Sequence, residues 1–326
     1  MSEIKDNNND CDDNNNQIEN PIFCDILSIP SNPEDIFTLI SPIGHGAFGT
    51  VYKALHNESK QIYAIKMVHY FKDEFSSISN HNHIFNINFY YKTAQEETSL
   101  MRLVNNSNYI LKYYGSYFSR KTNSLWLILE YCESGSIVDL MLAMDRTYNE
   151  IELATIIKMV LEGLILLHKK KLIHRDIKGA NILLSSDGYA KLGDFGVGVE
   201  MVNDKFRTSK KGSPYWMSPQ VVLKKDYDTK TDIWSLGITC LELINGEPPY
   251  SEMKPNKVME IIGKNQDFDE ILQATNNTTL SDDLKNFLKL CLIAEQEKRA
   301  TADELIKHPF IIKNARNNDY LKKLIN

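Results

Sequence analysis

Short runs of apolar and polar residues in the first part of the chain predict β-strands. The segments FTLISPIG (37–44), TVYKALH (50–56) and QIYAIKMV (61–68) are rich in β-branched or aromatic residues and are separated by turn residues. Such runs are typical of antiparallel strands. The later segment SLWLILEY (124–131) is apolar almost throughout, which predicts another strand that is buried.

Apolar residues recur at helical spacing in the rest of the chain. The segments 150–170, 231–244 and 281–293 carry them at near-helical intervals, which predicts three helices. A strand-rich first third followed by a helix-rich remainder predicts an α+β fold with two lobes. The length of 326 residues agrees with one large two-lobed unit or with two domains.

Two polar segments interrupt this pattern. Residues 1–34 contain the run DNNNDCDDNNNQ and bury too little apolar surface to offset the entropy of ordering, which predicts a disordered tail. Residues 71–92 include the Asn- and His-rich run SSISNHNHIFNINFYY, and we expect an inserted loop there. His81 and His83 within it are alternative metal ligands, but the lack of a nearby Cys or third His disfavours a metal site.

The net charge of −6 does not indicate a polyanionic partner. Residues 1–20 contain six Asp or Glu and one Lys, so five of the six net negative charges lie there. The remainder of the chain is nearly neutral. We therefore expect no nucleic-acid partner and no binding to a membrane surface.

Cysteine usage and hydropathy predict the compartment. The five cysteines are far apart and form no CxxC pair, which disfavours a disulfide framework or a zinc site and is typical of a reducing compartment. No early apolar run resembles a signal peptide, and no apolar stretch of about 18 residues predicts membrane insertion. We expect a cytoplasmic location, with the nucleus as the alternative.

The segment IGHGAFGTV (43–51) carries glycines at positions 44, 46 and 49. Glycine lets the backbone approach a phosphate closely and present N–H groups to it, so this segment is a candidate phosphate-binding loop. A dinucleotide-binding fingerprint needs a helix directly after the glycines, whereas the next residues predict a strand. Taken alone, the pattern agrees equally well with a simple hairpin loop.

Lys66 lies inside the apolar strand predicted over residues 61–68. A buried ammonium group is costly without an anionic partner. Lys66 therefore requires a phosphate or a carboxylate, unless its side chain points outward into solvent.

Two further segments carry side chains suited to phosphoryl transfer. The segment LIHRDIKGANILL (172–184) places Asp176, Lys178 and Asn181 in one short loop. A carboxylate accepts a proton from an attacking hydroxyl, a lysine holds a transferring phosphoryl group, and an Asn oxygen binds Mg²⁺. The segment KLGDFG adds Asp194 as a second Mg²⁺ ligand.

These four motifs, in this order, resemble the signature set of eukaryotic protein kinases. The resemblance covers about residues 35–310. It implies a bilobal protein-kinase fold with a β-rich N-lobe (about 35–131), a helical C-lobe (about 132–310) and a short C-terminal tail (311–326). The runs HRDIKGANILL, EYCESGSIVDL, ILKYYGSYF, GSPYWMSP and KHPF look like the sterile-twenty-like group, and NPEDIFTLISPIGHGAFGTVYKA looks most like its germinal-centre and Hippo-type branch.

The resemblance implies an ATP site between the lobes. Lys66 would bind the α- and β-phosphates and pair with Glu97 or, alternatively, Glu96. Asp176 would accept the proton of the substrate hydroxyl, while Lys178 would neutralise charge on the γ-phosphoryl group. The implied Mg²⁺ ligands are Asn181 and Asp194. The implied ATP-binding residues are Ile43, Gly44, His45, Gly46, Ala47, Phe48, Gly49, Thr50, Val51, Ala64, Lys66, Glu130, Cys132 and Leu183, with Leu129 as gatekeeper.

The resemblance also implies regulation by phosphorylation. Arg175, beside the catalytic aspartate, would bind a phosphate on the activation segment. Ser209 lies in the family's phosphosite register, with Thr208 as the alternative, and a phosphate there would order the segment. The implied regulatory partner is an upstream kinase or an adaptor.

One position departs from the family pattern. Where the family has Ala-Pro-Glu, this chain has Ser218, Pro219 and Gln220. The family's Glu pairs with an Arg of the C-lobe, which matches Arg299 here, so Gln220 keeps a hydrogen-bond acceptor and loses the charge. Asp232 resembles the aspartate that supports the catalytic-loop backbone.

The function that the sequence predicts is a Mg²⁺-ATP-dependent protein serine/threonine kinase acting on Ser or Thr hydroxyls of protein substrates. The Lys two positions after Asp176 is the pattern of Ser/Thr kinases rather than Tyr kinases. The alternative is a pseudokinase scaffold that binds nucleotide or partners without phosphoryl transfer. A small-molecule kinase is disfavoured, because GSPYWMSP looks suited to holding an extended peptide.

Overall fold

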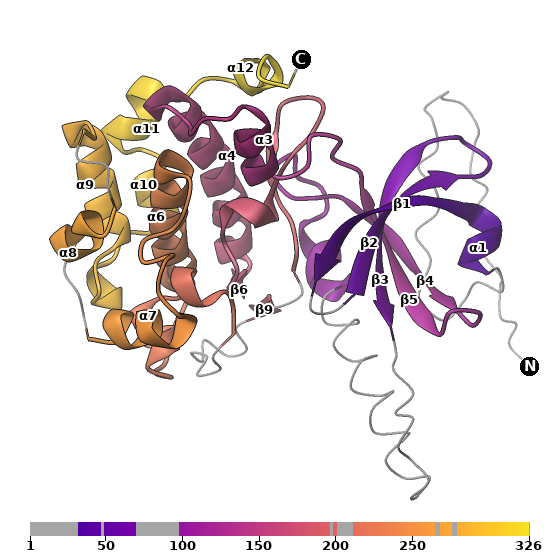
Figure 1. The fold of residues 1–326 in the computed structure, drawn as a ribbon, viewed down its shortest axis with the longest axis horizontal. Helices are drawn as coiled ribbons and strands as arrows, with labels where there is room; N and C mark the ends of the chain where they lie inside the picture. The colour runs from indigo at the N-terminus through magenta and orange to yellow at the C-terminus, as the bar shows by residue number, and fades with distance from the viewer. Residues whose placement is uncertain are drawn as a thin grey trace, which may run out of the picture.

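The computed structural model describes residues 32–46, 49–69, 98–195, 198–200, 211–264, 268–275 and 279–325. These residues form two lobes, one built on a β-sheet and the other mainly of helices (Figure 1). The α+β fold with a β-rich N-lobe and a helical C-lobe, predicted from the sequence, is confirmed.

The N-lobe contains one antiparallel sheet with the strand order β1-β2-β3-β5-β4. Its strands are β1 (Phe37–Gly46), β2 (Gly49–His56), β3 (Ile62–His69), β4 (Tyr113–Ser119) and β5 (Ser124–Glu130). The four strands predicted from short apolar runs correspond to β1, β2, β3 and β5. Strand β4 was not predicted, because its sequence YYGSYFS contains a glycine and lacks a clear alternation.

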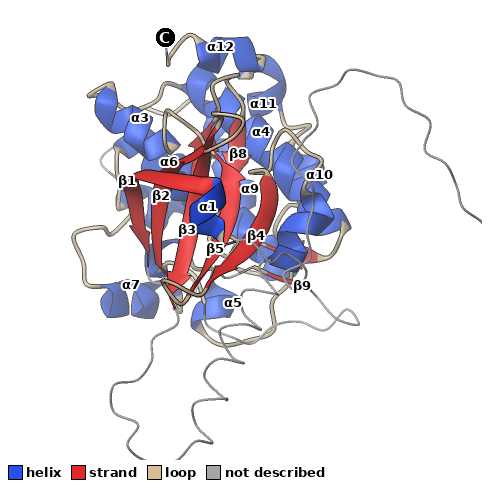
Figure 2. Cartoon of the chain, turned by 90° about the vertical axis from the view of Figure 1, so that its right-hand side faces the viewer, coloured by secondary structure: helices blue, strands red, loops and turns tan. Residues whose placement is uncertain are grey.

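Alternating side chains on these strands fill two separate clusters. Tyr63, Ile65 and Trp126 pack on one face of the sheet, where short helix α1 (Pro33–Ile36) also lies (Figure 2). Ala64 and Leu127 point to the other face and join the main core of the molecule. Neighbouring residues on a strand face opposite sides, so every second residue of β3 is directed toward the C-lobe.

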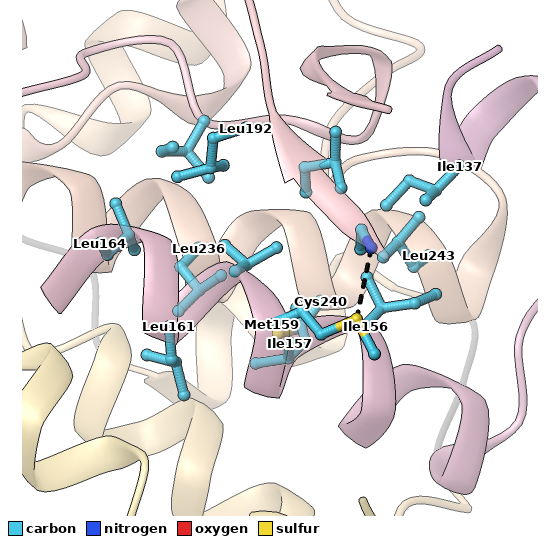
Figure 3. Close-up of a cluster of buried hydrophobic side chains, with 14 of the residues drawn as sticks. Ile137, Ile156, Ile157, Met159, Leu161, Leu164, Leu192, Leu236, Cys240 and Leu243 are labelled. Carbon is cyan, nitrogen blue, oxygen red and sulfur yellow. Dashed lines mark hydrogen bonds between the residues drawn. The ribbon is translucent and has the colours of Figure 1, made fainter. Parts of the chain in front are cut away.

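The C-lobe is organised around two long helices. Its helices are α3 (Ile137–Ala143), α4 (Glu150–Lys169), α5 (Pro219–Val222), α6 (Lys230–Asn245), α7 (Pro255–Ile262), α8 (Phe268–Gln273), α9 (Asp282–Cys291), α10 (Ala302–Leu305), α11 (Pro309–Asn314) and α12 (Asn318–Lys322). Helices α4 and α6 are buried along most of their length, and side chains such as Ile157 and Leu236 form the core that Figure 3 shows. The segments predicted as helices correspond to α4, α6 and α9.

Four short strands after α4 carry the loops of interest, and one of them is tied to the N-lobe. Strands β7 (Ile182–Leu184) and β8 (Ala190–Leu192) form a hairpin, while β6 (Leu172–Ile173) pairs with β9 (Val199–Glu200). The Leu111 N–H donates to the carbonyl of Leu192 (2.9 Å), which ties β8 to the segment before β4. The chain passes from β5 to α3 through residues 131–136, called the hinge below.

The predicted flanking segments fall partly inside the described structure. Residues 1–31 and the predicted insert at 71–92 lie outside the described residues, whereas α1 begins at Pro33, within the range assigned to the N-terminal tail. The range assigned to the C-terminal tail contains most of α11 and all of α12, where Leu321 is buried. No helix in the described part of the chain is long and apolar enough to span a membrane.

Candidate active site

The loop between β6 and β7 is held by a buried carboxylate on α6. Asp232 accepts hydrogen bonds from the backbone N–H groups of His174 (3.0 Å) and Arg175 (2.8 Å), and its carboxylate lies 2.9 Å from Nε2 of His168. Burial by itself raises the pKa of Asp232, but the hydrogen bonds and the nearby histidines outweigh it and lower the pKa. Asp232 therefore supports this loop as an anion.

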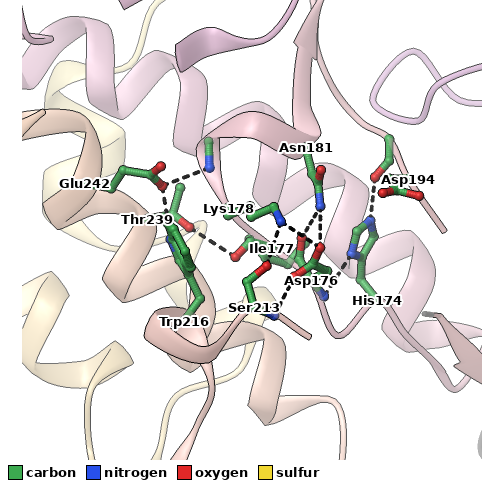
Figure 4. A network of polar contacts seen from close by, with 12 residues as sticks. His174, Asp176, Ile177, Lys178, Asn181, Asp194, Ser213, Trp216, Thr239 and Glu242 are labelled. Carbon is green, nitrogen blue, oxygen red and sulfur yellow. Dashed lines mark hydrogen bonds and ion pairs between the residues drawn. The ribbon is translucent and has the colours of Figure 1, made fainter. Parts of the chain in front are cut away.

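Asp176 is oriented by three groups (Figure 4). The Ser213 N–H donates to Oδ1 (2.9 Å), and Nδ2 of Asn181 donates to Oδ2 (2.8 Å). Nζ of Lys178 lies 3.1 Å from Oδ2 and donates to Oγ of Ser213 (2.6 Å). The three side chains that the sequence placed in one loop are thus brought together, and Ser213 joins them from a segment that lies far along the chain.

Asn181 and Asp194 carry oxygen atoms suited to a hard cation. Nδ2 of Asn181 is directed to Asp176, where it donates to both the carbonyl (2.8 Å) and the carboxylate, so the amide oxygen is the atom available to a cation. Carboxylate and amide oxygens are the ligands that Mg²⁺ prefers, and Mg²⁺ is commonly bound by one or two protein groups together with phosphates. The donor chemistry of these two residues therefore fits Mg²⁺.

Lys66 meets a carboxylate across the lobes. Its Nζ lies 2.9 Å from Oδ1 of Asp194, and the Lys66 residue is 9% exposed. The expectation that this buried lysine has an anionic partner is confirmed. Asp194 adopts a left-handed backbone conformation (φ 56°). Glu97 and Glu96, the carboxylates predicted to pair with Lys66, lie outside the described residues.

The described glycines of the glycine-rich segment lie on β1 and β2, where these two strands meet. Gly46 pairs with Gly49, and the strand predicted after the glycines, in place of the helix that a dinucleotide-binding fingerprint needs, is confirmed as β2. Gly49 has φ 148°, and a Cβ at this position would lie 1.8 Å from the carbonyl oxygen of Met67. Only glycine fits there. Ala47 and Phe48 lie outside the described residues.

The predicted ATP-binding residues and the predicted gatekeeper lie on both lobes. Val51, Ala64 and Leu129 belong to the sheet face turned toward the C-lobe, and Leu183 belongs to the β7–β8 hairpin. The isolated bridge between Ser136 and Leu183 places this hairpin beside the end of the hinge. The remaining predicted ATP-binding residues, Ile43, Gly44, His45 and Thr50, lie on β1 and β2.

The residue directly before the hinge is anchored by an ion pair that the sequence did not indicate. Nζ of Lys191 lies 3.0 Å from Oε2 of Glu130, and the side chains are 4% and 18% exposed. The Lys112 N–H also donates to this carboxylate (3.2 Å). Burial raises the pKa of the neighbouring Cys132 thiol to about 12, so this group is a thiol rather than a thiolate near neutral pH.

A second buried carboxylate, that of Glu242, connects the segment between β6 and β7 to Trp216 in the run GSPYWMSPQ. Oε2 of Glu242 accepts hydrogen bonds from the Gly179 N–H (2.9 Å) and from Nε1 of Trp216 (3.0 Å). Burial raises the pKa of Glu242, although these hydrogen bonds and the charge of Lys178 oppose the effect. Glu242 and Trp216 lie at one end of the network in Figure 4, and Asp194 lies at the other.

Gln220, on helix α5, is held by hydrogen bonds rather than by an ion pair. Nη2 of Arg299 donates to Oε1 of Gln220 (3.0 Å), and Nε2 of Gln220 donates to the carbonyl of Ala294 (2.6 Å). The expectation that Gln220 retains a hydrogen bond with Arg299 is confirmed. Burial lowers the pKa of Arg299 to about 10.

Of the residues predicted to take part in regulation, the structure describes Arg175. Ser209 and Thr208 lie outside the described residues. Arg175, the predicted phosphate ligand, is buried, and its guanidinium lies 3.4 Å from the Tyr227 hydroxyl and 3.3 Å from the Gly198 carbonyl.

A two-lobed fold with a carboxylate, two lysines and an amide gathered between the lobes is the architecture of a phosphoryl-transfer enzyme class. Comparison with protein families agrees: the protein kinase domain matches residues 37–311 of this chain. Because the match covers most of the 326 residues, the chain belongs to the protein kinase domain family. The family transfers phosphoryl groups from ATP to proteins, typically with Mg²⁺.

Proposed function

We propose that this protein is an active Mg²⁺-ATP-dependent protein serine/threonine kinase. The observation that carries the proposal is the orientation of Asp176, whose carboxylate accepts hydrogen bonds from Ser213 and Asn181. A carboxylate held in this way retains lone pairs for a substrate hydroxyl. Ser213 also links Asp176 to Lys178, which places a positive charge beside the base.

The proposed reaction is a direct transfer. The substrate hydroxyl oxygen attacks the γ-phosphorus, the bond between this phosphorus and the β–γ bridging oxygen breaks, and ADP leaves. Asp176 orients the hydroxyl and accepts its proton. Lys178 stabilises negative charge on the γ-phosphoryl oxygens, and Lys66 binds the α- and β-phosphates. Mg²⁺, held by oxygens of Asn181 and Asp194, supplies further charge neutralisation when bound.

Adenine would lie between the sheet and the β7–β8 hairpin. Val51 and Ala64 would contact it from the N-lobe and Leu183 from the C-lobe, since these apolar side chains face the junction. Backbone groups of Glu130 and Cys132 would bind its edge. The glycine hairpin would cover the phosphates, because Gly49 allows the backbone to pass close to its neighbours.

Phosphate transfer from radiolabelled ATP is the direct test. The full chain is incubated with Mg²⁺ and a generic basic protein, beside Asp176→Asn, which keeps the size of the side chain. We expect transfer to Ser and Thr by the native chain and a loss of about 100-fold or more in the variant. Equal transfer by both would contradict the role of Asp176.

The competing hypothesis is a pseudokinase scaffold. It predicts that the native chain binds ATP and transfers no phosphate, even after incubation with an activating kinase. The presence of Lys66, Asp176, Asn181 and Asp194 argues against it, because each group needed for transfer is in the sequence. Phosphorylation of a small molecule without phosphorylation of protein would instead support a metabolic kinase.

We further propose that the enzyme belongs to the sterile-twenty-like group and is activated by phosphorylation of Ser209 or Thr208. The group assignment rests on the runs quoted above, and the regulation rests on Arg175 beside Asp176. Peptide mass spectrometry of active enzyme should find phosphate at one of the two sites. Full activity of the doubly Ala-substituted protein would refute this regulation.

A further inference from the structure

The sheet face that points to the C-lobe carries a second lysine. In the antiparallel register of β2 and β3, Val51 lies opposite Lys66 and Lys53 lies opposite Ala64. Residues opposite each other share one face of a sheet. Lys53 is therefore on the same face as Lys66, and it lies beside the position that contacts adenine in the proposed site.

Lys53 is directed to the hinge rather than to the phosphates. Its Nζ lies 4.8 Å from the centroid of the Tyr131 ring, a cation–π contact. Both residues are half-buried, and Tyr131 packs against the main core. Lys66 by contrast reaches Asp194 at the catalytic end of the junction. The two lysines thus mark opposite ends of the proposed nucleotide site.

The hinge residues next to Tyr131 are attached to the C-lobe. The Lys191–Glu130 ion pair (3.0 Å) joins the residue before Tyr131 to β8. After the hinge turn, the Leu184 N–H donates to the carbonyl of Gly135 (3.0 Å). Tyr131 directly follows β5, so its contact with Lys53 ties β2 to the start of the hinge, and the ion pair at Glu130 ties the start of the hinge to β8.

We propose that Lys53 and Tyr131 form a latch between the N-lobe sheet and the hinge that slows the release of adenine nucleotides. Lys53 is a positioning residue here, since it touches the hinge and not the reacting atoms. The inference rests on the proposed function, because it assumes that the nucleotide lies between Ala64 and Leu183. A cation–π contact of this exposure is expected to change the release rate about two- to five-fold.

The latch differs in a measurable way from simple charge attraction. If Lys53 acted by attracting phosphates, its removal would weaken ADP binding and leave adenosine binding unchanged. A latch between the sheet and the hinge acts on access to the nucleotide site. Its removal therefore weakens the binding of ADP and of adenosine by the same factor. Adenosine is therefore the discriminating ligand.

The experiment measures the dissociation rate of a fluorescent ADP analogue and the affinity of adenosine by competition, using the full chain. Lys53→Met and Tyr131→Leu should each raise the release rate about two- to five-fold, and the double variant should add nothing further. Lys53→Arg and Tyr131→Phe keep the cation and the ring and should restore slow release. Lys60→Met, an exposed lysine on the turn between β2 and β3, is the matched control.

The possible results distinguish failure of the latch from failure of the proposed nucleotide site. Unchanged release in the single variants, additive effects in the double variant, or a loss confined to ADP would overturn the latch while leaving the proposed kinase function intact. A native chain that binds neither ligand would overturn the proposed nucleotide site and the latch with it. Equal melting temperatures of Lys53→Met and the native chain exclude unfolding as the cause of faster release.

Discussion

Replacing Gln220 with glutamate is expected to stabilise the protein. The guanidinium of Arg299 is almost completely buried and donates to the carbonyls of Ile293, Lys230 and Ala294 as well as to Gln220. All four acceptors are uncharged. Burial is the main reason that its pKa falls from 12.5 to about 10, and the charges that oppose this fall are more distant.

The magnitude follows from these contacts. A shift of this size corresponds to about 3 kcal/mol against the charged form, at 1.36 kcal/mol per pKa unit. A carboxylate in place of the Gln220 amide oxygen would recover about 2 kcal/mol through a charge-assisted hydrogen bond. Glutamate cannot replace the donor that Gln220 directs at the Ala294 carbonyl, which costs about 1 kcal/mol. The net gain is about 1 kcal/mol, or about 2 °C in melting temperature.

Thermal unfolding and urea titration of Gln220→Glu beside the native chain measure this gain. Gln273→Glu, which makes the same charge change at an exposed position of α8, is the control and should leave stability unchanged. A melting temperature of Gln220→Glu equal to or below that of the native chain would refute the reasoning. The buried arginine would then be satisfied by carbonyl groups alone.

Three further predictions concern the buried groups. Lys191→Met leaves the Glu130 carboxylate without its cation and should lower the free energy of unfolding, measured in urea, by about 2–3 kcal/mol. Lys191→Met combined with Glu130→Leu should recover most of this loss. Unchanged stability of the single variant would contradict a stabilising ion pair. Because the pKa of Glu242 is raised in the folded protein, its ionised carboxylate lowers the stability above this pKa, and this cost disappears as the pH falls through the pKa. Glu242→Gln should therefore be more stable than the native protein at pH 8. The difference in stability between the two proteins should close toward pH ~4.5. A difference that does not vary with pH in urea titrations would count against this. Because burial raises the pKa of Cys132 to about 12, iodoacetamide at pH ~8 should label this thiol in urea and not in the native protein. Peptide mass spectrometry measures the labelling. Equal labelling in the two conditions would show that the hinge is open to the reagent.

The alternation of side chains predicted most of the fold. Four of the five N-lobe strands and the helices α4, α6 and α9 follow from local spacing, because each element buries one face or stripe against a neighbour. Strand β4 was missed, since its burial depends on pairing with β5 rather than on its own pattern. Tertiary contacts override weak local signals of this kind.

The side chains of the proposed active site were predictable in part from their unusual setting, and their roles were predicted from the family resemblance. A lysine inside an apolar strand signalled a need for an anion at Lys66, although its partner Asp194 lies 128 residues away and only the fold identifies it. Glu242 gave no such signal. It lies in the run CLELI, where nothing in the sequence shows that its carboxylate meets Gly179 and Trp216, residues that are 63 and 26 positions distant.

The folded C-lobe continues past the end of the family match, because α12 packs against it. The family match ends at residue 311, whereas Leu321 beyond it is 1% exposed and Nδ2 of Asn318 donates to the carbonyl of Asp187 (2.8 Å). A chain truncated where the recognisable domain stops would uncover apolar surface beside α4 that favours aggregation. A fragment meant to stay soluble must therefore include α12 in addition to the residues that the family match covers.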